Sequence, residues 1–418
     1  LGNWIEGFSS LGIAIRTCLE MAIVEHAVKR PLWKFTNYGQ CGQPVSELFP
    51  HMAQHADELC VLKGMHTEGV AHGPSTLFMH SGTINLIRPS MGSWLLYGLG
   101  SENRDLPGFV AMSPRAQPRG KLANWGNSFL PGVYAGTYIN IAEMKPEAAV
   151  RHLRNQHLQP AEQRRQADLL TRVNQLLLEQ RQKDQQLEAS IQAMELAFRM
   201  QFAVPDVFET AQESKATLDL YGDSEFAKGC LLARRLVERG VRMVQLSHSL
   251  DSYDIAWDTG HGDIEGGHAA LAKACDQGIA ALLQDLKLRG LLEDTLVIWG
   301  GEFGRTSYCQ GGLSKTNYGR DHHPRCFTIW MAGGGIKPGI TYGRTDDYAY
   351  NIADPDGQPM DPQPSREGWT PGSMHIHDLN ATILHLAGID HKRLTYRYQG
   401  RDFRLTDVHG HVMTDLIA

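Results

Sequence analysis

The amino-acid sequence predicts an α/β fold, in which a mostly parallel central sheet carries helices on both faces. From residue 223 onward, amphipathic helical patterns alternate with short, almost continuous apolar runs. Such runs are typical of strands that are buried on both faces of a sheet. The length of 418 residues and the 43 glycines also suit a large core with many turns, with room for more than one domain.

Three regions of the chain differ in character. Residues 1–140 contain short apolar runs such as ELCVLKGM and LPGFVAM between segments rich in Gly and Pro, which predicts the first strands of the α/β domain and long loops. Residues 141–222 are dominated by helix formers with apolar residues at helical spacing. We interpret them as a helical insertion, a hairpin laid on the core, with a coiled-coil partner site or an oligomer interface as alternatives. Residues 223–418 form the C-terminal part of the α/β domain.

The elements of this last region follow from local signals. Ser224 is a suitable N-cap for a helix that Gly240 ends, and the strand VRMVQLSH comes next. A second helix is expected over residues 265–289, and the strands TLVIWGG and FTIWMAGGG follow it. Asp378 is predicted to cap the helix LNATILHLAG.

Composition excludes several classes of function. The 40 basic and 46 acidic residues give a net charge of −6, and no basic run is present, which argues against nucleic-acid binding. The seven cysteines form no CxxC pair, so neither a zinc ribbon nor a redox pair is indicated. The segment LGIAIRTCLEMAIVEHAVKR reads as an amphipathic helix, and neither a membrane span nor a signal peptide is visible.

Acidic and histidine side chains cluster around the predicted strand ends. The strand VRMVQLSH leads into a loop that contains Asp258 and His261, and TLVIWGG is followed directly by Glu302. The loop GRDHHP places His322 and His323 just before FTIW. Ligands gather at the carboxyl ends of strands in such sheets, and carboxylates with imidazoles suit zinc, manganese, iron or magnesium. The alternatives are that Glu302 caps a turn and that the two histidines only donate hydrogen bonds or pack on an aromatic ring.

Several longer motifs carry a family resemblance. GLLEDTLVIWGGEFGRT, GRDHHP, AGGGIKPGITYGRTDD, HIHDLNATILHLAGIDH and LTYRYQGRDFRLTDVHG resemble the DUF1501 proteins, which are sulfatase-like members of the alkaline phosphatase superfamily. The resemblance extends over most of residues 35–418. It implies an alkaline phosphatase-like α/β fold, a divalent metal ion (zinc, manganese, calcium or magnesium) and export to the periplasm or envelope.

The resemblance also implies roles for individual residues. Glu302 matches an acidic metal ligand, Asp258 and His261 resemble an Asp-x-x-x-His ligand pair that is one residue short, and His322 or His323 would complete that metal site. Phe303 stands where a second ligand is usual.

In AHGPSTLFMHSG, His72 falls at the place of the nucleophile in the C/S-x-P-S-R motif of sulfatases and Thr76 at that of its arginine, so a formylglycine mechanism is not supported. His72 or Ser75 would act instead, or His72 would be a loop histidine near an anion pocket. Nothing in residues 1–40 matches the first strand and its metal-binding Asp.

Taken together, the sequence predicts a metal-dependent hydrolase of sulfate or phosphate esters, acting on a small-molecule or polysaccharide substrate. Arg305 would steady the anion oxygens as a planar, bidentate donor. The alternative hypothesis is a non-catalytic binding or envelope-associated protein that retains the fold.

Overall fold

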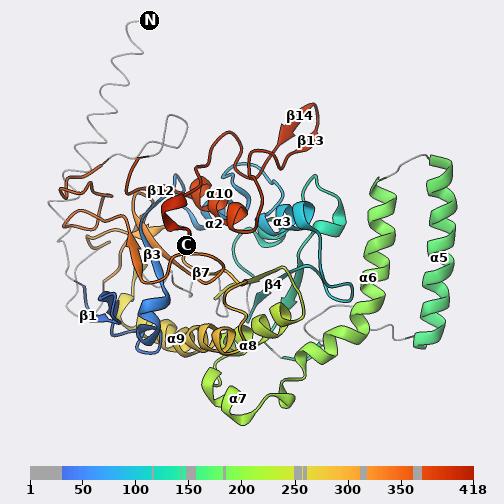
Figure 1. Cartoon of the computed structure of the whole chain (residues 1–418), viewed down its shortest axis with the longest axis horizontal. Coiled ribbons are helices and arrows are strands. Elements are labelled where there is room, and N and C mark those ends of the chain that lie inside the picture. The colour runs from blue at the N-terminus through green and yellow to red at the C-terminus, as the bar shows by residue number, and fades with distance from the viewer. Residues whose placement is uncertain are drawn as a thin grey trace, which may run out of the picture.

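The computed structural model describes residues 31–114, 117–142, 144–146, 157–181, 185–248, 257, 261–310, 318–360 and 370–418. Within these residues, helices and strands alternate along much of the chain, and the strands gather in the middle of the molecule (Figure 1). The mixed helix and strand fold predicted from the sequence is confirmed. The predicted N-terminal helix lies outside the described residues.

The larger sheet has five strands in the order β11–β3–β10–β7, with β12 also paired to β3. Its strands are β3 (Cys60–His66), β7 (Val297–Trp299), β10 (Phe327–Ala332), β11 (Ile340–Tyr342) and β12 (Met374–His375). β11 and β12 run parallel to β3, whereas β10 is antiparallel to both β3 and β7. β3 is buried on both faces, as its apolar run predicts.

The second sheet is fully parallel and has the order β5–β4–β6. Its strands are β4 (Phe109–Ser113), β5 (Thr137–Asn140) and β6 (Met243–Leu246). Among the described residues, no strand joins this sheet to the first one, so the single central sheet that the sequence predicts is found as two sheets. β6 and β7 are the edges of their respective sheets.

Helices cover both faces of the larger sheet (Figure 1). On one face, Leu62 and Ile329 pack with residues of α3 and α10, and on the other Val61 and Ala332 pack with α8 and α9. The helices on these faces are α2 (His72–Ser81), α3 (Met91–Leu99), α7 (Lys215–Tyr221), α8 (Glu225–Glu238), α9 (Ile264–Leu288) and α10 (Ile376–Leu386).

α8 confirms the prediction made from its sequence. The Ser224 side chain accepts a hydrogen bond from the Ala227 N–H and caps the helix, and Phe226 and Cys230 are buried. Gly240 follows the helix with a φ of +78°, a conformation that favours glycine.

The predicted cap of α10 is wrong. His375, not Asp378, is the N-cap, and its Nδ1 accepts the His377 N–H at 3.2 Å. Asp378 lies at the third helical position, where Oδ2 accepts the His375 N–H at 3.0 Å and Oδ1 accepts the His411 N–H at 2.7 Å. The helix begins earlier than expected because β12 ends at His375 and leads directly into Ile376.

Replacing Asp378 with alanine should destabilise the protein by about 1–3 kcal/mol. Two backbone N–H groups in buried or part-buried positions would lose their acceptor, and an unsatisfied buried donor costs about that much. The urea midpoint of unfolding measures the effect. Asp402→Ala, at an exposed carboxylate, is the matched control and should change the midpoint little. Equal effects of the two substitutions would contradict this role of Asp378.

The predicted helical segment contains two long helices that lie side by side at one end of the molecule (Figure 1). They are α5 (Pro160–Arg181) and α6 (Gln185–Phe208). α6 joins the core through Met200 and Val204, whereas Leu169 and Leu176 of α5 are 63% and 60% exposed. The use of this segment as an oligomer interface stays a prediction.

Three short two-stranded pairings complete the fold. They are β1 (Phe35–Tyr38) with β2 (Gln43–Ser46), β8 (Gly304–Arg305) with β9 (His322–His323), and β13 (Tyr396–Tyr398) with β14 (Arg401–Phe403). No helix in the described part of the chain combines the length and the apolar character needed to cross a membrane.

Candidate metal centre

Three histidines that are far apart in the sequence converge in the structure. His72 is the first residue of α2, His261 precedes the Asp263 N-cap of α9, and His322 begins β9. One nitrogen of each ring lies within 4.8 Å of the corresponding nitrogens of the other two. All three residues are partly buried, so they are held in place and still accessible to solvent.

His72 is oriented by a carboxylate. Its Nδ1 lies 2.5 Å from Oε1 of Glu302, which follows β7 after two glycines. Gly300, which follows β7 directly, lets the chain pass close to β10, because a Cβ there would lie 2.5 Å from Ile329. A carboxylate on Nδ1 makes that nitrogen the proton donor and leaves Nε2 with its lone pair for a ligand.

His322 and His261 show the same pattern. Nδ1 of His322 lies 2.7 Å from the Val70 carbonyl oxygen, and Nδ1 of His261 contacts Oε1 of Gln310. Both oxygens accept a hydrogen bond, so each Nδ1 carries the proton. The two Nε2 atoms then face one another at a distance of 2.8 Å.

Two imidazole lone pairs at 2.8 Å repel one another unless a metal ion lies between them or one of the two nitrogens takes up a proton and donates it to the other. Tetrahedral zinc with bonds of about 2.0–2.1 Å would separate its nitrogen ligands by roughly 3.3 Å, which a small movement of the rings achieves. Oxygen acceptors on the second ring nitrogen are the usual partners of histidines that bind metal. The donor set therefore fits a divalent metal ion.

The aromatic side chain of Phe303 packs against the group of three histidines. The Phe303 ring centroid lies 4.3 Å from that of His322 and 5.0 Å from that of His72. An apolar ring at this place strengthens electrostatic interactions in the site, because it excludes water. Phe303 thus has a packing role where the sequence comparison expected a ligand.

Arg305 lies on the strand next to His322. β8 pairs Arg305 with His322, and the guanidinium donates from Nη1 to the Arg320 carbonyl at 3.2 Å and from Nη2 to the Trp257 carbonyl at 3.5 Å. The Arg305 side chain is partly buried. Its predicted role in holding an anion stays a prediction.

The structure does not bring all predicted metal ligands together. His323 points away from His322, as successive residues of a strand do, and its Nε2 lies 2.6 Å from the Tyr350 carbonyl oxygen. Its ring stacks on Tyr350, and burial lowers the pKa of the imidazole. Asp258 lies outside the described residues.

Ser75, the second predicted nucleophile, is buried. It is 1% exposed, and among the described residues its Oγ has no hydrogen-bond partner. It packs against Gly69, where a Cβ would lie 2.0 Å from this oxygen. Because solvent does not reach it, its predicted nucleophilic role would require the Gly69 loop to move.

Some residues of the centre were missed or given another role by the sequence interpretation. His72, predicted as a nucleophile, a general base or a loop histidine near an anion pocket, also lies in the group of three histidines, and its catalytic role stays a prediction. Gln310 and the Val70 carbonyl were not predicted, since an amide side chain and a backbone oxygen carry no sequence signal for this task.

A second histidine group lies near β12 and α10. His66 and His377 are buried, and burial lowers the pKa of His66 to about 3 and that of His377 to about 2. His375 lies between them and contacts Glu68 at 3.0 Å. Among the described residues, this second group does not bring three ligand atoms within 4.8 Å of one another, as His72, His261 and His322 do. These side chains belong to the core around α10.

Glu302→Ala should weaken the binding of a divalent metal ion by about 10–100-fold, because His72 would lose the carboxylate that fixes its ring and its proton. Isothermal titration with Zn²⁺ measures the change. Glu293→Ala removes an exposed carboxylate a few residues earlier and should leave the affinity unchanged. A Glu302→Ala variant with the affinity of the parent protein would show that Glu302 does not orient His72.

Comparisons with known proteins were made for the whole chain. No curated protein matches it. Among solved structures, the crystal structure of Ps i-CgsB in complex with k-i-k-neocarrahexaose is similar at 12% identity and a TM-score of 0.37. The similarity covers 81% of this chain and 66% of that chain. The family profile described as "Protein of unknown function (DUF1501)" matches residues 13–417, and the chain therefore belongs to the DUF1501 family.

Proposed function

We propose that His72, His261 and His322 bind a divalent metal ion and that the protein is a metal-dependent hydrolase of sulfate or phosphate esters. One observation carries the proposal: three imidazoles converge, and each has an oxygen acceptor at Nδ1. With Nδ1 as the proton donor, each Nε2 keeps a lone pair that a metal ion could bind, and one nitrogen of each ring lies within 4.8 Å of the other two. This is the protonation state that metal binding requires.

The ligand set favours zinc over the other candidates. Imidazole nitrogen suits zinc, whereas calcium and magnesium prefer oxygen ligands. Three protein ligands leave a position for water or substrate, which is the pattern of catalytic zinc sites. A metal bound here would polarise an ester oxygen and lower the pKa of a bound water.

The protein's own residues would orient the substrate. Arg305 lies beside His322 and has a planar donor group that matches the oxygens of sulfate or phosphate. Phe303 restricts the access of water on one side of the group. Glu302 holds the His72 ring and its proton, so this carboxylate acts through His72.

The test combines metal analysis with an ester panel. The full chain, loaded with Zn²⁺, is assayed against aryl sulfates and aryl phosphates, with EDTA-treated protein as the control. Turnover that EDTA removes and Zn²⁺ restores is the expected result. Metal binding without turnover of either class would favour the non-catalytic binding protein, and the absence of a bound divalent ion would refute the metal centre.

A further inference from the structure

We infer that Glu68 and His375 position His322 for metal binding and that they act through the loop of residues 67–71. This loop joins the end of β3 to the start of α2. Its backbone makes the contact with His322, so Glu68 and His375 would be positioning residues and not ligands. The inference rests on the proposed metal centre, which needs His322 in one fixed orientation.

The loop reaches the metal centre through a backbone oxygen. The Val70 carbonyl oxygen lies 2.7 Å from Nδ1 of His322 and accepts a hydrogen bond from it. The Val70 side chain is 61% exposed, so the contact at this point depends on the carbonyl group and not on apolar packing. Whether His322 keeps its proton on Nδ1 therefore depends on where the backbone of the loop lies.

Backbone hydrogen bonds hold the two ends of the loop. At its start, the Thr67 N–H donates to the Pro324 carbonyl at 3.0 Å, and at its end the Ser75 N–H in α2 donates to the Ala71 carbonyl at 3.0 Å. Pro324 directly follows β9, so the start of the loop lies next to that strand. Residues 68–70 lie between these bonds, and the chain there needs a further contact to be fixed.

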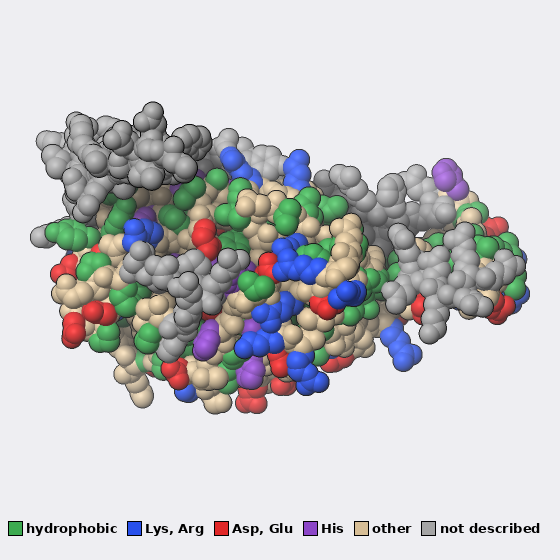
Figure 2. Space-filling view, turned by 90° about the horizontal axis from the view of Figure 1, so that it is seen from above, with side chains coloured by type: hydrophobic (Ala, Val, Ile, Leu, Met, Phe, Trp, Pro, Cys, Tyr) green, Lys and Arg blue, Asp and Glu red, His purple; other side chains and the backbone are tan. Residues whose placement is uncertain are grey.

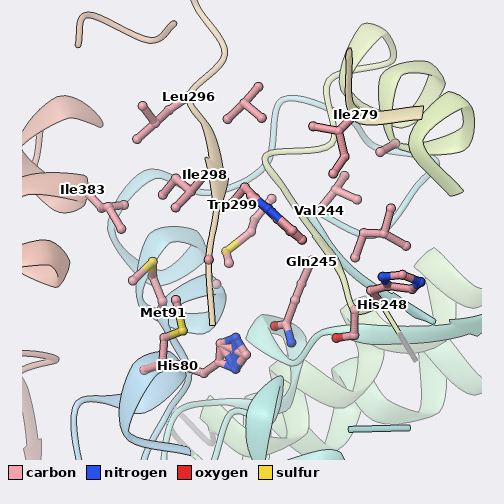
Figure 3. Close-up of a pocket in the computed structure, with 18 of the residues that line it drawn as sticks. His80, Met91, Val244, Gln245, His248, Ile279, Leu296, Ile298, Trp299 and Ile383 are labelled. Atoms are coloured by element: carbon pink, nitrogen blue, oxygen red, sulfur yellow. The ribbon is translucent and has the colours of Figure 1, made fainter. Parts of the chain in front are cut away.

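α2 gives the loop a firm support. Its Phe78 side chain is buried in the core, and His80 faces the cavity of about 1270 Å³ between the two sheets (Figure 3). Gly69 lies directly on the first turn of this helix, because a Cβ there would be 2.0 Å from Oγ of Ser75. The loop therefore packs closely on a helix that is itself anchored in the core.

A side-chain contact holds the loop between its two ends. Nε2 of His375 lies 3.0 Å from Oε2 of Glu68. Nδ1 of His375 accepts the His377 N–H at 3.2 Å, so the proton of the neutral His375 ring is on Nε2 and is donated to Glu68. A hydrogen bond to a carboxylate is stronger than one between neutral groups, which makes this contact a suitable anchor.

His375 is a rigid partner for the loop. It is 1% exposed, and in β12 it pairs with His66, the last residue of β3. Its own N–H donates to Oδ2 of Asp378 at 3.0 Å. The Glu68 side chain, by contrast, is 48% exposed. An exposed loop residue is thus bound to a buried residue of the larger sheet, and the Val70 carbonyl follows two residues later.

Nuclear magnetic resonance of the metal-free full chain gives the first readout. With ¹⁵N-labelled histidine, long-range ¹H–¹⁵N spectra at pH 7.5 report which ring nitrogens carry protons, and the signals of His322 are identified by their loss in His322→Ala. Nδ1 of His322 should be protonated in the parent protein, because the Val70 carbonyl accepts its hydrogen bond. In Glu68→Ala, the Nδ1 signal should shift toward the value of an unprotonated nitrogen, since the ring can then change its tautomer.

The second readout is the affinity for Zn²⁺, measured by isothermal titration. Glu68→Ala should weaken it about 3–10-fold, less than the roughly 10–100-fold expected for the loss of a direct outer partner, because Glu68 acts through the loop. Glu68→Gln should bind Zn²⁺ within about 2-fold of the parent protein, because its amide oxygen accepts the same hydrogen bond from Nε2 of His375. A role of the negative charge alone predicts no such recovery.

Glu102→Ala is the matched control. Glu102 is also a carboxylate with a nitrogen partner, Arg242, at 3.1 Å, and its side chain is 78% exposed. Acidic side chains are scattered over the face of the molecule that Figure 2 shows, so the loss of one carboxylate should change the long-range electrostatics little. This variant should leave both readouts unchanged, and circular dichroism checks that all variants fold.

The two readouts separate this inference from the metal centre itself. A parent protein that binds no Zn²⁺ would refute the metal centre, whereas the position of the proton on His322 is measured without metal and still decides whether Glu68 acts on that ring. The inference is overturned if Glu68→Ala leaves Nδ1 of His322 protonated as in the parent protein. It is also overturned if Glu68→Gln is as impaired as Glu68→Ala.

Discussion

Replacing His322 with alanine should weaken the binding of Zn²⁺ by at least about 100-fold and abolish any metal-dependent ester hydrolysis. His322 lies between the other two histidines, with ring centroids 4.4 Å from His72 and 4.6 Å from His261. Its loss would leave two imidazoles, fewer ligands than a zinc site needs. Loss of an outer partner such as Glu302 costs about 10–100-fold, and loss of a ligand costs more.

The control for this substitution is His385→Ala. His385 is an exposed residue in the last turn of α10, and it lies outside the group of three histidines. Both variants remove one imidazole, so general effects of histidine on metal binding cancel between them. Isothermal titration and metal analysis after dialysis give the readout. If both variants retain Zn²⁺ equally, the histidine group is not the metal centre.

The affinity of the three histidines for Zn²⁺ should also decrease as the pH decreases. Each imidazole must be neutral to bind a metal, so protons compete with the metal ion for the three Nε2 atoms as the pH falls. Titrations at pH 7.5 and 5.5 should therefore differ, with the weaker binding at the lower pH, and Glu302→Ala should show the same direction of change.

Local sequence signals predicted the helices well because they act within a few residues. Ser224 and Gly240 mark the ends of α8 correctly, since an N-cap side chain contacts a backbone N–H three residues away. α10 shows the limit of this reasoning. Its start depends on the pairing of β12 with His66 in β3, more than 300 residues earlier, and no local signal reports that pairing.

The candidate site was partly predicted for a related reason. The rule that ligands gather at strand ends pointed to Glu302, His261 and His322. It could not choose between His322 and His323, because the choice depends on which face of β9 meets α2. It also could not assign His72 to this group, because the contact with Glu302 joins residues 230 positions apart.

The gap between the sheets was not predictable from the composition of β6 and β7. VRMVQLSH and TLVIWGG read as strands buried on both faces, and both are strands in the structure. Periodicity reports which face of a strand is apolar and says nothing about whether its edges are paired. Edge pairing depends on the full set of strands, which is a property of the assembled sheet.

Replacing Arg234 with alanine should destabilise the protein by about 3–5 kcal/mol. Arg234 lies on α8, is 1% exposed, and forms ion pairs of 2.8 Å with Glu213, Glu238 and Asp285. The side chains of Glu213 and Asp285 are each 7% exposed. Without the guanidinium, two buried carboxylates lose an opposite charge, and breaking a buried network in this way costs about that much.

The network should also make stability depend on pH. Burial alone would raise the pKa of Glu213. Hydrogen bonds from Arg234 and Arg235 lower it by a larger amount, so the pKa lies below its usual value of 4.5. A carboxyl with a lowered pKa stabilises the folded state above its unfolded pKa, and this stability is lost as the pH falls through the folded pKa. The loss on going from pH 5 to pH 3 should therefore be smaller in Arg234→Ala than in the parent protein.

Two further variants separate the lost charge from lost packing. Arg397→Ala removes an arginine that forms an ion pair with Asp402 at the surface, where the side chains of Arg397 and Asp402 are 67% and 55% exposed. The substitution should change the free energy of unfolding by less than about 1 kcal/mol. Combining Arg234→Met with Glu213→Gln and Asp285→Asn removes all three charges and should recover part of the loss. If the triple variant is no more stable than Arg234→Ala, the lost packing of the arginine, and not its charge, accounts for the effect.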